Sequence, residues 1–179
     1  GIVTRRGGGA VVGRGVEAGF ELAVASPDGG GAIVYRSPET ASLCAADDEV
    51  AAISHPPDGD LFHPIARIVD LSDGRIVAEL DDDGLGLEPI AFSPGGDRRL
   101  LVRHSRHDRT GLLIWSPDSG AVEEVTVHLE GDVPGKWRPD ASGLLLVSSL
   151  DGRDSLSRLD LASGSLEHLD APRGVIDEW

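Results

Sequence analysis

The hydrophobic residues of this chain fall in short segments rich in Val, Ile and Leu, many of which alternate apolar and polar positions. Such alternation is typical of a half-buried β-strand. Gly, Pro, Asp and Ser interrupt the segments too often for a helix of three turns. The pattern therefore predicts an all-β chain with negligible helix.

The segments group into four units of four strands, which we label A to D from the inside of the fold outward. We expect strands at 2–4, 10–14, 20–25 and 32–36 in unit one (about 1–36), and at 42–45, 50–54, 65–70 and 75–80 in unit two (about 42–80). We expect 88–92, 100–104, 111–115 and 122–127 in unit three (about 88–127), and 135–138, 144–148, 155–160 and 165–169 in unit four (about 135–169). Residues 175–179 are expected to start a further unit.

Two turn signals recur with one period along the chain. Pro94 and Pro139 stand 45 residues apart, and a glycine closing a polar turn recurs at spacings of 44, 46 and 44 residues, at Gly30, Gly74, Gly120 and Gly164. Four antiparallel strands in a repeat of this length indicate the blade of a β-propeller. Because rings usually hold about 4 to 8 blades, we predict one partial propeller domain over 1–179, part of a six- to eight-bladed ring.

The connections between strands divide into two classes. The A–B and C–D turns are short and stereotyped, whereas the B–C and D–A connections are longer and more varied, at 55–64, 81–87, 105–110 and 128–134. In an antiparallel meander the two classes lie at opposite ends of the blades. Since varied loops often carry contacts, we expect the B–C and D–A end to be the contact surface.

Composition excludes several classes of partner. The 179 residues suit one domain, and a net charge of −15 disfavours binding to nucleic acid or to anionic lipid. The longest apolar runs, 112–115 and 144–147, are far too short to span a membrane. We expect a cytoplasmic protein, and the absence of an initial Met suggests a piece of a longer chain.

Three stretches carry residues that could serve a ligand. His104, His107 and Asp108 could bind zinc, but their position in a hairpin turn favours a polar loop tip. Residues 81–88 have the carboxylate density of a calcium loop without its spacing, so we interpret them as a solvated blade connection. Residues 13–19 half resemble a dinucleotide-binding glycine motif, but no helix follows, and we interpret them as a B–C turn.

No residue of the chain is assigned a catalytic, cofactor-binding or metal-binding role. The sequence lacks Gly-x-Ser-x-Gly, the turn that presents a nucleophilic serine in α/β-hydrolases. Cys44 lies in an apolar stretch and is interpreted as a buried, inert thiol. Trp115 and Trp137 fall in expected strands and are interpreted as packing residues between blades.

A set of turn motifs and strand segments carries a further signal. These are Ser-Pro-Gly-Gly-Asp97, Arg-Pro-Asp-Ala-Ser-Gly143, Asp-Arg-Thr-Gly111, Leu-Asp-Gly152, Asp160-Leu-Ala-Ser-Gly164, Ile53-Ser-His55, Gly84-Leu-Gly-Leu-Glu-Pro89, Arg99-Leu-Leu-Val102 with His104, Leu113-Ile-Trp115 and Leu169-Asp-Ala-Pro172-Arg-Gly174. They resemble the blades of Tol-type propellers, and most closely those of the N-terminal propeller of prolyl oligopeptidase family serine peptidases, which include acylaminoacyl peptidases. The resemblance is best from Val50 to Gly174 and points to bacterial, actinobacterial-type members.

The resemblance implies a non-catalytic domain that gates substrate access and docks on a C-terminal α/β-hydrolase domain, through which peptide substrates are cleaved. Three alternatives remain: a free-standing scaffold for protein contacts, a periplasmic translocation-type propeller, and a lactonase-type enzyme with a central metal. The last would need acidic or amide ligands on the innermost strands, and 42–45 and 135–138 offer none.

An arc of four blades leaves one face of the first blade and one face of the last without a neighbour. We expect these end faces to expose apolar area and sheet edges. The sequence therefore predicts self-association of the isolated chain through its end blades.

Overall fold

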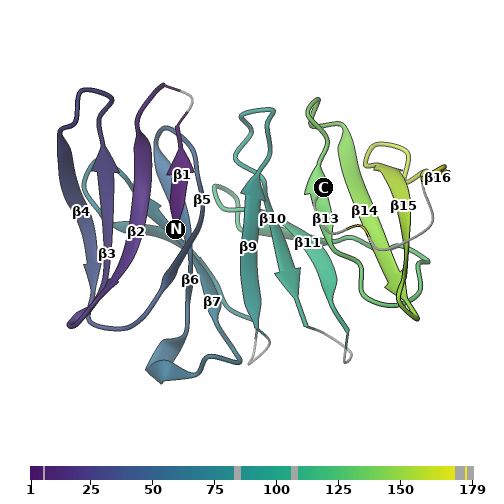
Figure 1. Ribbon diagram of the computed structural model, residues 1–179, viewed down its shortest axis with the longest axis horizontal. Coiled ribbons are helices and arrows are strands. Elements are labelled where there is room, and N and C mark those ends of the chain that lie inside the picture. Colours follow the sequence, from purple (N-terminus) through teal and green to yellow (C-terminus); the bar gives the residue numbers. More distant parts are fainter. Residues whose placement is uncertain (6, 83–85, 106–108, 172–175, 177–179) are drawn as a thin grey trace.

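The computed structural model describes residues 1–5, 7–82, 86–105, 109–171 and 176, which form four antiparallel four-stranded sheets standing side by side (Figure 1). The first two sheets comprise β1 (Ile2–Thr4), β2 (Ala10–Val16), β3 (Gly19–Ala25) and β4 (Gly31–Ser37), then β5 (Ser42–Ala46), β6 (Val50–His55), β7 (Ile65–Asp70) and β8 (Ile76–Leu80). The other two comprise β9 (Leu87–Phe92), β10 (Leu100–His104), β11 (Gly111–Ser116) and β12 (Ala121–Glu124), then β13 (Gly135–Trp137), β14 (Gly143–Leu150), β15 (Arg153–Asp160) and β16 (Leu166–Leu169).

Each sheet is a meander in which neighbours in sequence are neighbours in space. This confirms the predicted all-β class and the four units of four strands. The helical content of the described residues is a single 3-10 turn, η1 (Pro57–Gly59), and none of their segments forms a helix able to cross a membrane. The total number of blades in a ring stays a prediction.

The predicted strand ends differ from the observed ones in the third and fourth sheets. β12 ends at Glu124 instead of residue 127, although the Val125 N–H still donates to the Leu112 carbonyl at 2.9 Å. β14 and β15 are longer than predicted, because β14 continues to Leu150 and β15 already begins at Arg153, where the two residues pair. The reason is a two-residue Asp151-Gly152 turn with φ of 52° and 72°, whose twist matches that of the paired strands.

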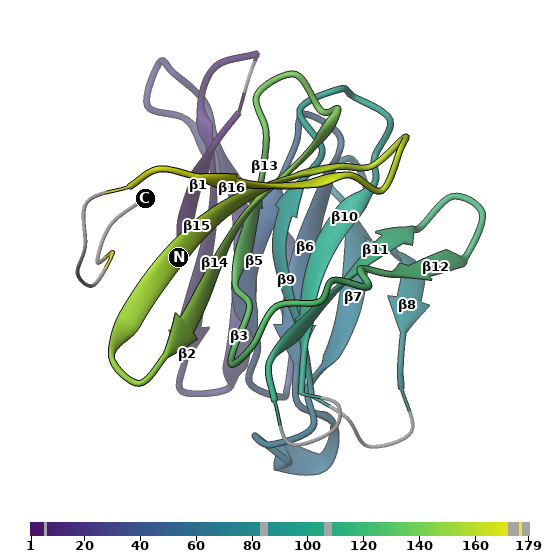
Figure 2. The same ribbon diagram turned by 90° about the vertical axis from the view of Figure 1, so that its right-hand side faces the viewer.

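Three apolar cores lie between successive sheets, which stack face to face as Figure 2 shows. Strand β6 sends Ala51 and Ile53 toward the first sheet and Val50 and Ala52 toward the third. Strand β10 contributes in the same way to the cores on its two sides. The second and third sheets are therefore buried on both faces, which explains why β6 begins with four consecutive apolar residues and β10 with three.

The recurring glycines are required by backbone geometry. Gly74 has φ of 74°, and a Cβ there would lie 1.8 Å from the Val34 carbonyl oxygen. Gly120 and Gly164 occupy the same left-handed region, as the repeat predicts. In the first sheet the left-handed residue of this turn is Gly29, with φ of 89°, next to the recurring Gly30.

The outer faces of the first and fourth sheets carry cross-strand ion pairs. On the first sheet Glu21 accepts hydrogen bonds from Arg14 Nη2 at 2.6 Å and Arg36 Nε at 3.0 Å, which lower the pKa of Glu21. On the fourth sheet Arg158 pairs with Glu167. Polar groups thus occupy part of each end face, and self-association through these faces stays a prediction.

The strand predicted at 175–179 lies outside the described residues except for Ile176. The backbone N–H of Ile176 donates to Asp154 Oδ2 at 2.6 Å, beside the β14–β15 hairpin. The Thr110 N–H makes a comparable bond to Asp132 Oδ1 at 2.8 Å between the third and fourth sheets. Each bond joins the start of a C strand, at Thr110 or Asp154, to the residue 22 positions later, so Ile176 is the counterpart of Asp132 in the repeat.

We expect Trp115→Ala to destabilise the fold strongly. The Trp115 side chain is 1% exposed in the core between the second and third sheets. Its truncation leaves a cavity, so the free energy of unfolding should fall by about 3–5 kcal/mol in urea titrations. The control Val122→Ala, at a side chain 43% exposed, should change it by less than about 0.5 kcal/mol. Equal effects of the two substitutions would contradict the inter-sheet packing.

Candidate functional site

The turn end of the molecule, where the A–B and C–D turns gather, is built on repeated aspartate-capped turns. Asp70 Oδ1 accepts hydrogen bonds from the Ser72 N–H at 2.7 Å and the Ser72 hydroxyl at 2.6 Å. Asp160 Oδ1 does the same with Ser163, at 2.8 and 2.7 Å. These bonds stabilise the ionised form of both side chains, and therefore lower the pKa of Asp70 and Asp160. The repeated Asp-Leu-x-x-Gly motif thus serves turn geometry.

A cavity of about 650 Å³, which we call the turn-end pocket, opens at this end among the first three sheets. Its floor is apolar and includes Val50, Ile68 and Phe92. Its rim is charged and includes Arg5, Asp48, Glu49, Arg98 and Asp118.

Arg5 ties the first sheet to the second at one side of the turn-end pocket. Its Nη2 donates to the Asp48 carbonyl at 2.6 Å, and its Nε lies 3.7 Å from Asp48 Oδ1. The Gly7 N–H also donates to Asp48 Oδ1, at 2.9 Å. Asp48 therefore holds the β1–β2 turn against the β5–β6 turn.

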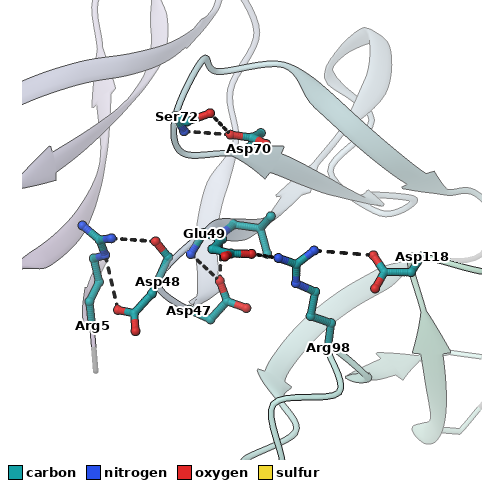
Figure 3. Close-up of polar contacts among 9 residues, drawn as sticks. Arg5, Asp47, Asp48, Glu49, Asp70, Ser72, Arg98 and Asp118 are labelled. Atoms are coloured by element: carbon teal, nitrogen blue, oxygen red, sulfur yellow. Dashed lines mark hydrogen bonds and ion pairs between the residues drawn. The ribbon is translucent and has the colours of Figure 1, made fainter. Parts of the chain in front are cut away.

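Arg98 makes the matching link between the second and third sheets. It pairs with Glu49 and lies 3.7 Å from Asp118 Oδ1, as Figure 3 shows. Asp47 Oδ1 fixes the position of Glu49 by accepting the N–H groups of Glu49 and Val50, each at 2.7 Å. Both guanidinium groups at the rim are therefore engaged by carboxylates.

The turn-end pocket has the chemistry of a binding or packing surface. The residues that line it include neither histidine nor cysteine, and its one hydroxyl lining residue, Ser72, donates to Asp70. Carboxylates outnumber guanidinium groups, and Glu49 and Asp118 keep side-chain exposures of 68% and 70%. Such a rim can attract a cationic group, and the Ser72–Asp70 bond is the local bond of a C–D turn.

The loop end of the molecule, where the B–C and D–A connections gather, holds two buried histidines at the ends of B strands. His55 ends β6 and is fully buried, with Nε2 2.7 Å from Glu39 Oε2. His104 ends β10 and is 3% exposed, with Nε2 2.7 Å from Glu124 Oε1. Burial, reinforced by the nearby Arg67, lowers the pKa of His55. The lowered pKa favours the neutral form of His55.

A second cavity, of about 400 Å³, lies at the loop end of the third sheet, and we call it the loop-end pocket. Its walls are largely apolar, and Arg109 and Glu124 stand at its rim; the apolar lining residues are Leu112, Val125, Val127 and Val133. One wall is pinned by the Thr110 N–H, which donates to Asp132 Oδ1 at 2.8 Å.

The stretch considered for zinc adjoins this loop-end pocket. His107 and Asp108 lie outside the described residues, and His104 is directed at Glu124. Within the described part of the chain, no three His, Cys, Asp or Glu side chains are grouped to hold a metal ion. In the stretch considered for calcium, residues 83–85 also lie outside the described residues.

The glycine stretch at 13–19 is a hairpin, as predicted. Gly13 and Gly15 lie within β2, and the turn to β3 is made by 17–18. A Cβ on Gly13 would lie 2.5 Å from Leu43 Cβ, so this glycine permits the close approach of the first two sheets.

The packing roles predicted for the two tryptophans are confirmed. Trp115 is buried between the second and third sheets and Trp137 between the third and fourth. Trp137 Nε1 donates to the Ala91 carbonyl at 3.0 Å, and the Arg99 guanidinium stacks 5.1 Å from the ring centre.

Cys44 lies on the inner strand β5 and is partly exposed, less buried than predicted. Desolvation raises the pKa of its thiol to about 11, and Sγ lies 3.4 Å from the Ser42 carbonyl oxygen. It therefore stays a thiol at neutral pH, in agreement with the predicted lack of reactivity.

Sequence reasoning missed the partners of the charged residues. These residues, such as Glu39, Arg98 and Glu124, lie in turns or on an exposed strand. Charged residues are common at such positions, so nothing in the sequence marks these three as paired. Only the recurrence of a histidine at the end of a B strand, His55 and His104, was visible as a signal.

Comparisons with known proteins place the fold. No protein-family model matches the chain, and no curated protein matches it in sequence. Among solved structures, it is similar to a TolB-like protein from Agrobacterium tumefaciens, with a TM-score of 0.66, 16% identity, and coverage of 92% of this chain and 62% of that one.

Two peptidases of known structure are also similar to this chain. A puromycin-hydrolysing peptidase from Mycobacterium tuberculosis matches with a TM-score of 0.63, 19% identity, and coverage of 93% of this chain and 28% of that one. Prolyl oligopeptidase B from Galerina marginata matches with a TM-score of 0.69 and 13% identity, and the match covers 99% of this chain and 27% of that one. The chain spans less than two thirds of each protein. These similarities show a β-propeller fold of the kind found in TolB-like proteins and in prolyl oligopeptidase-type peptidases.

We expect His55 to make the stability of the fold depend on pH. Because its folded-state pKa is lowered, the unfolded chain binds more protons below about pH 6.5, and stability falls as pH drops through that range. Urea midpoints measured between about pH 7.5 and 5.5 should fall for the wild type and fall less for His55→Gln.

The matched control is His128→Gln. The side chain of His128 is exposed, so comparing this variant with His55→Gln separates the effect of burial from that of removing a histidine. Identical slopes for wild type and His55→Gln would show that the buried histidine does not titrate on unfolding.

Proposed function

We propose that this chain is the non-catalytic propeller domain of a prolyl oligopeptidase-like serine peptidase, where it gates substrate access and docks on an α/β-hydrolase domain. The observation that carries the proposal is the fold: four blades that match the propellers of two such peptidases over more than nine tenths of the chain. The turn motifs from Val50 to Gly174 support the same assignment.

The charged and titratable side chains of the described residues support a non-catalytic role. His55 and His104, the buried histidines, are directed at glutamates and end strands inside the fold. The thiol of Cys44 has a raised pKa. The sequence contains no Gly-x-Ser-x-Gly turn. Peptide cleavage in this proposal belongs to the hydrolase domain.

The loop end supports the docking part of the proposal. It carries the longer and more varied connections between strands, which often form contacts. We further propose a cytoplasmic, bacterial protein that acts on peptides through the hydrolase domain, within the acylaminoacyl peptidase branch. Self-association through the end blades is a separate part of the proposal.

A free-standing scaffold for protein contacts is the second candidate. It is favoured by the match to the TolB-like protein, whose TM-score of 0.66 lies between those of the two peptidases. The gene region that follows the codon for Trp179 distinguishes the candidates. An α/β-hydrolase with Gly-x-Ser-x-Gly encoded in the same reading frame supports the peptidase domain, and a stop codon shortly after supports the scaffold.

We expect the purified chain alone to leave aminoacyl chromogenic substrates uncleaved and a fluorophosphonate probe unreacted. The reason is that the sequence lacks a serine elbow and that we locate no oxyanion site among the described residues. The heat-denatured chain is the matched blank. Turnover or labelling by the folded chain above that blank would contradict the non-catalytic assignment.

A further inference from the structure

The B–C loop of the second sheet presents two large apolar side chains to solvent. Phe62 is 86% exposed and Leu61 is 72% exposed. They follow η1 and precede Pro64, in the loop that projects beyond the sheet at the lower edge of Figure 1. Among the described large apolar residues, only Ile2 is comparably exposed, and it lies on a strand.

This loop is fixed by its own hydrogen bonds. Asp60 Oδ1 accepts the Phe62 N–H at 3.0 Å, and Asp60 Oδ2 lies 2.6 Å from His63 Nδ1. The Asp60 N–H donates to the Pro57 carbonyl at 3.0 Å, and the Leu87 N–H donates to the Pro64 carbonyl at 2.7 Å. Because these bonds order the loop in the free chain, binding through Leu61 and Phe62 costs less conformational entropy than binding through a flexible loop.

The loop-end pocket has the complementary properties. It lies at the same end of the molecule, its volume is about 400 Å³, and its apolar walls include Leu112, Val127 and Val133. The cationic Arg109 stands at its rim, and Glu124 in that rim is directed at His104. The protruding loop carries Asp58, whose charge is opposite to that of Arg109, so the two surfaces match in apolar character and in this pair of charges.

We propose that Leu61 and Phe62 of one copy of this chain insert into the loop-end pocket of a second copy. Loop and pocket lie at the same end of each molecule, so a two-fold axis that opposes the loop ends of two copies brings each loop to the pocket of the other. The contact is isologous and closes at a dimer. It uses the loop end, in contrast to the outer faces of the first and fourth sheets.

The first test is the association constant of the chain, measured by sedimentation equilibrium for wild type and Phe62→Ala. Removing an aromatic anchor should weaken dimerisation by at least about 10-fold. Ile2→Ala is the matched control, because Ile2 is 74% exposed but lies opposite Val12, in the middle of β2, and it should leave the constant unchanged. Both side chains are exposed, so neither substitution should affect folding.

The second test is complementation between two defective copies. Phe62→Ala lacks the aromatic anchor and keeps the pocket, whereas Val127→Glu places a carboxylate in the pocket and keeps the anchor. Each should dimerise poorly alone, and an equimolar mixture should form a heterodimer through the one intact contact. A circular dichroism melt of Val127→Glu checks that it is folded.

Three results would overturn the proposal. These are a wild-type chain that stays monomeric at high micromolar concentration, a dimer whose association constant is the same in Phe62→Ala, and a mixture of the two variants that associates no better than either alone. The second result would leave the outer faces of the first and fourth sheets as the alternative contact of the dimer.

Discussion

Burial of sheet faces between neighbouring sheets is the constraint on which this fold depends. A twisted four-stranded sheet has two faces, and the second and third sheets cover both of theirs with apolar neighbours. Leu100 and Leu101, adjacent on β10, therefore enter different cores. No single blade could be stable alone, because each supplies only half of every core that it contacts.

The stacking also separates the molecule into two ends with different chemistry. Short turns capped by aspartates gather at the turn end, where Arg5 and Arg98 bridge successive sheets through Asp48 and Glu49. The loop end carries buried histidines, longer loops and exposed apolar side chains. The turn end therefore holds the blades in register, and the loop end has the surface suited to contact with another molecule.

The glutamate partners of His55 and His104 illustrate why the candidate sites could be predicted only in part. A histidine at the end of a buried strand is visible in the sequence, but Glu39 precedes β5 and Glu124 ends β12. Nothing local distinguishes these carboxylates from the others of an acidic chain with net charge −15. Their pairing follows from strand register and sheet stacking.

The sequence by itself determined the strands, their grouping and the turns, because alternation, glycine and proline act on the chain within a few residues. It indicated even the packing role of Trp115. Only the tertiary structure decided that Arg98 joins Glu49 to Asp118, and that Leu61 and Phe62 stay outside every core. These outcomes depend on how sheets distant in sequence twist and stack, which no short segment specifies.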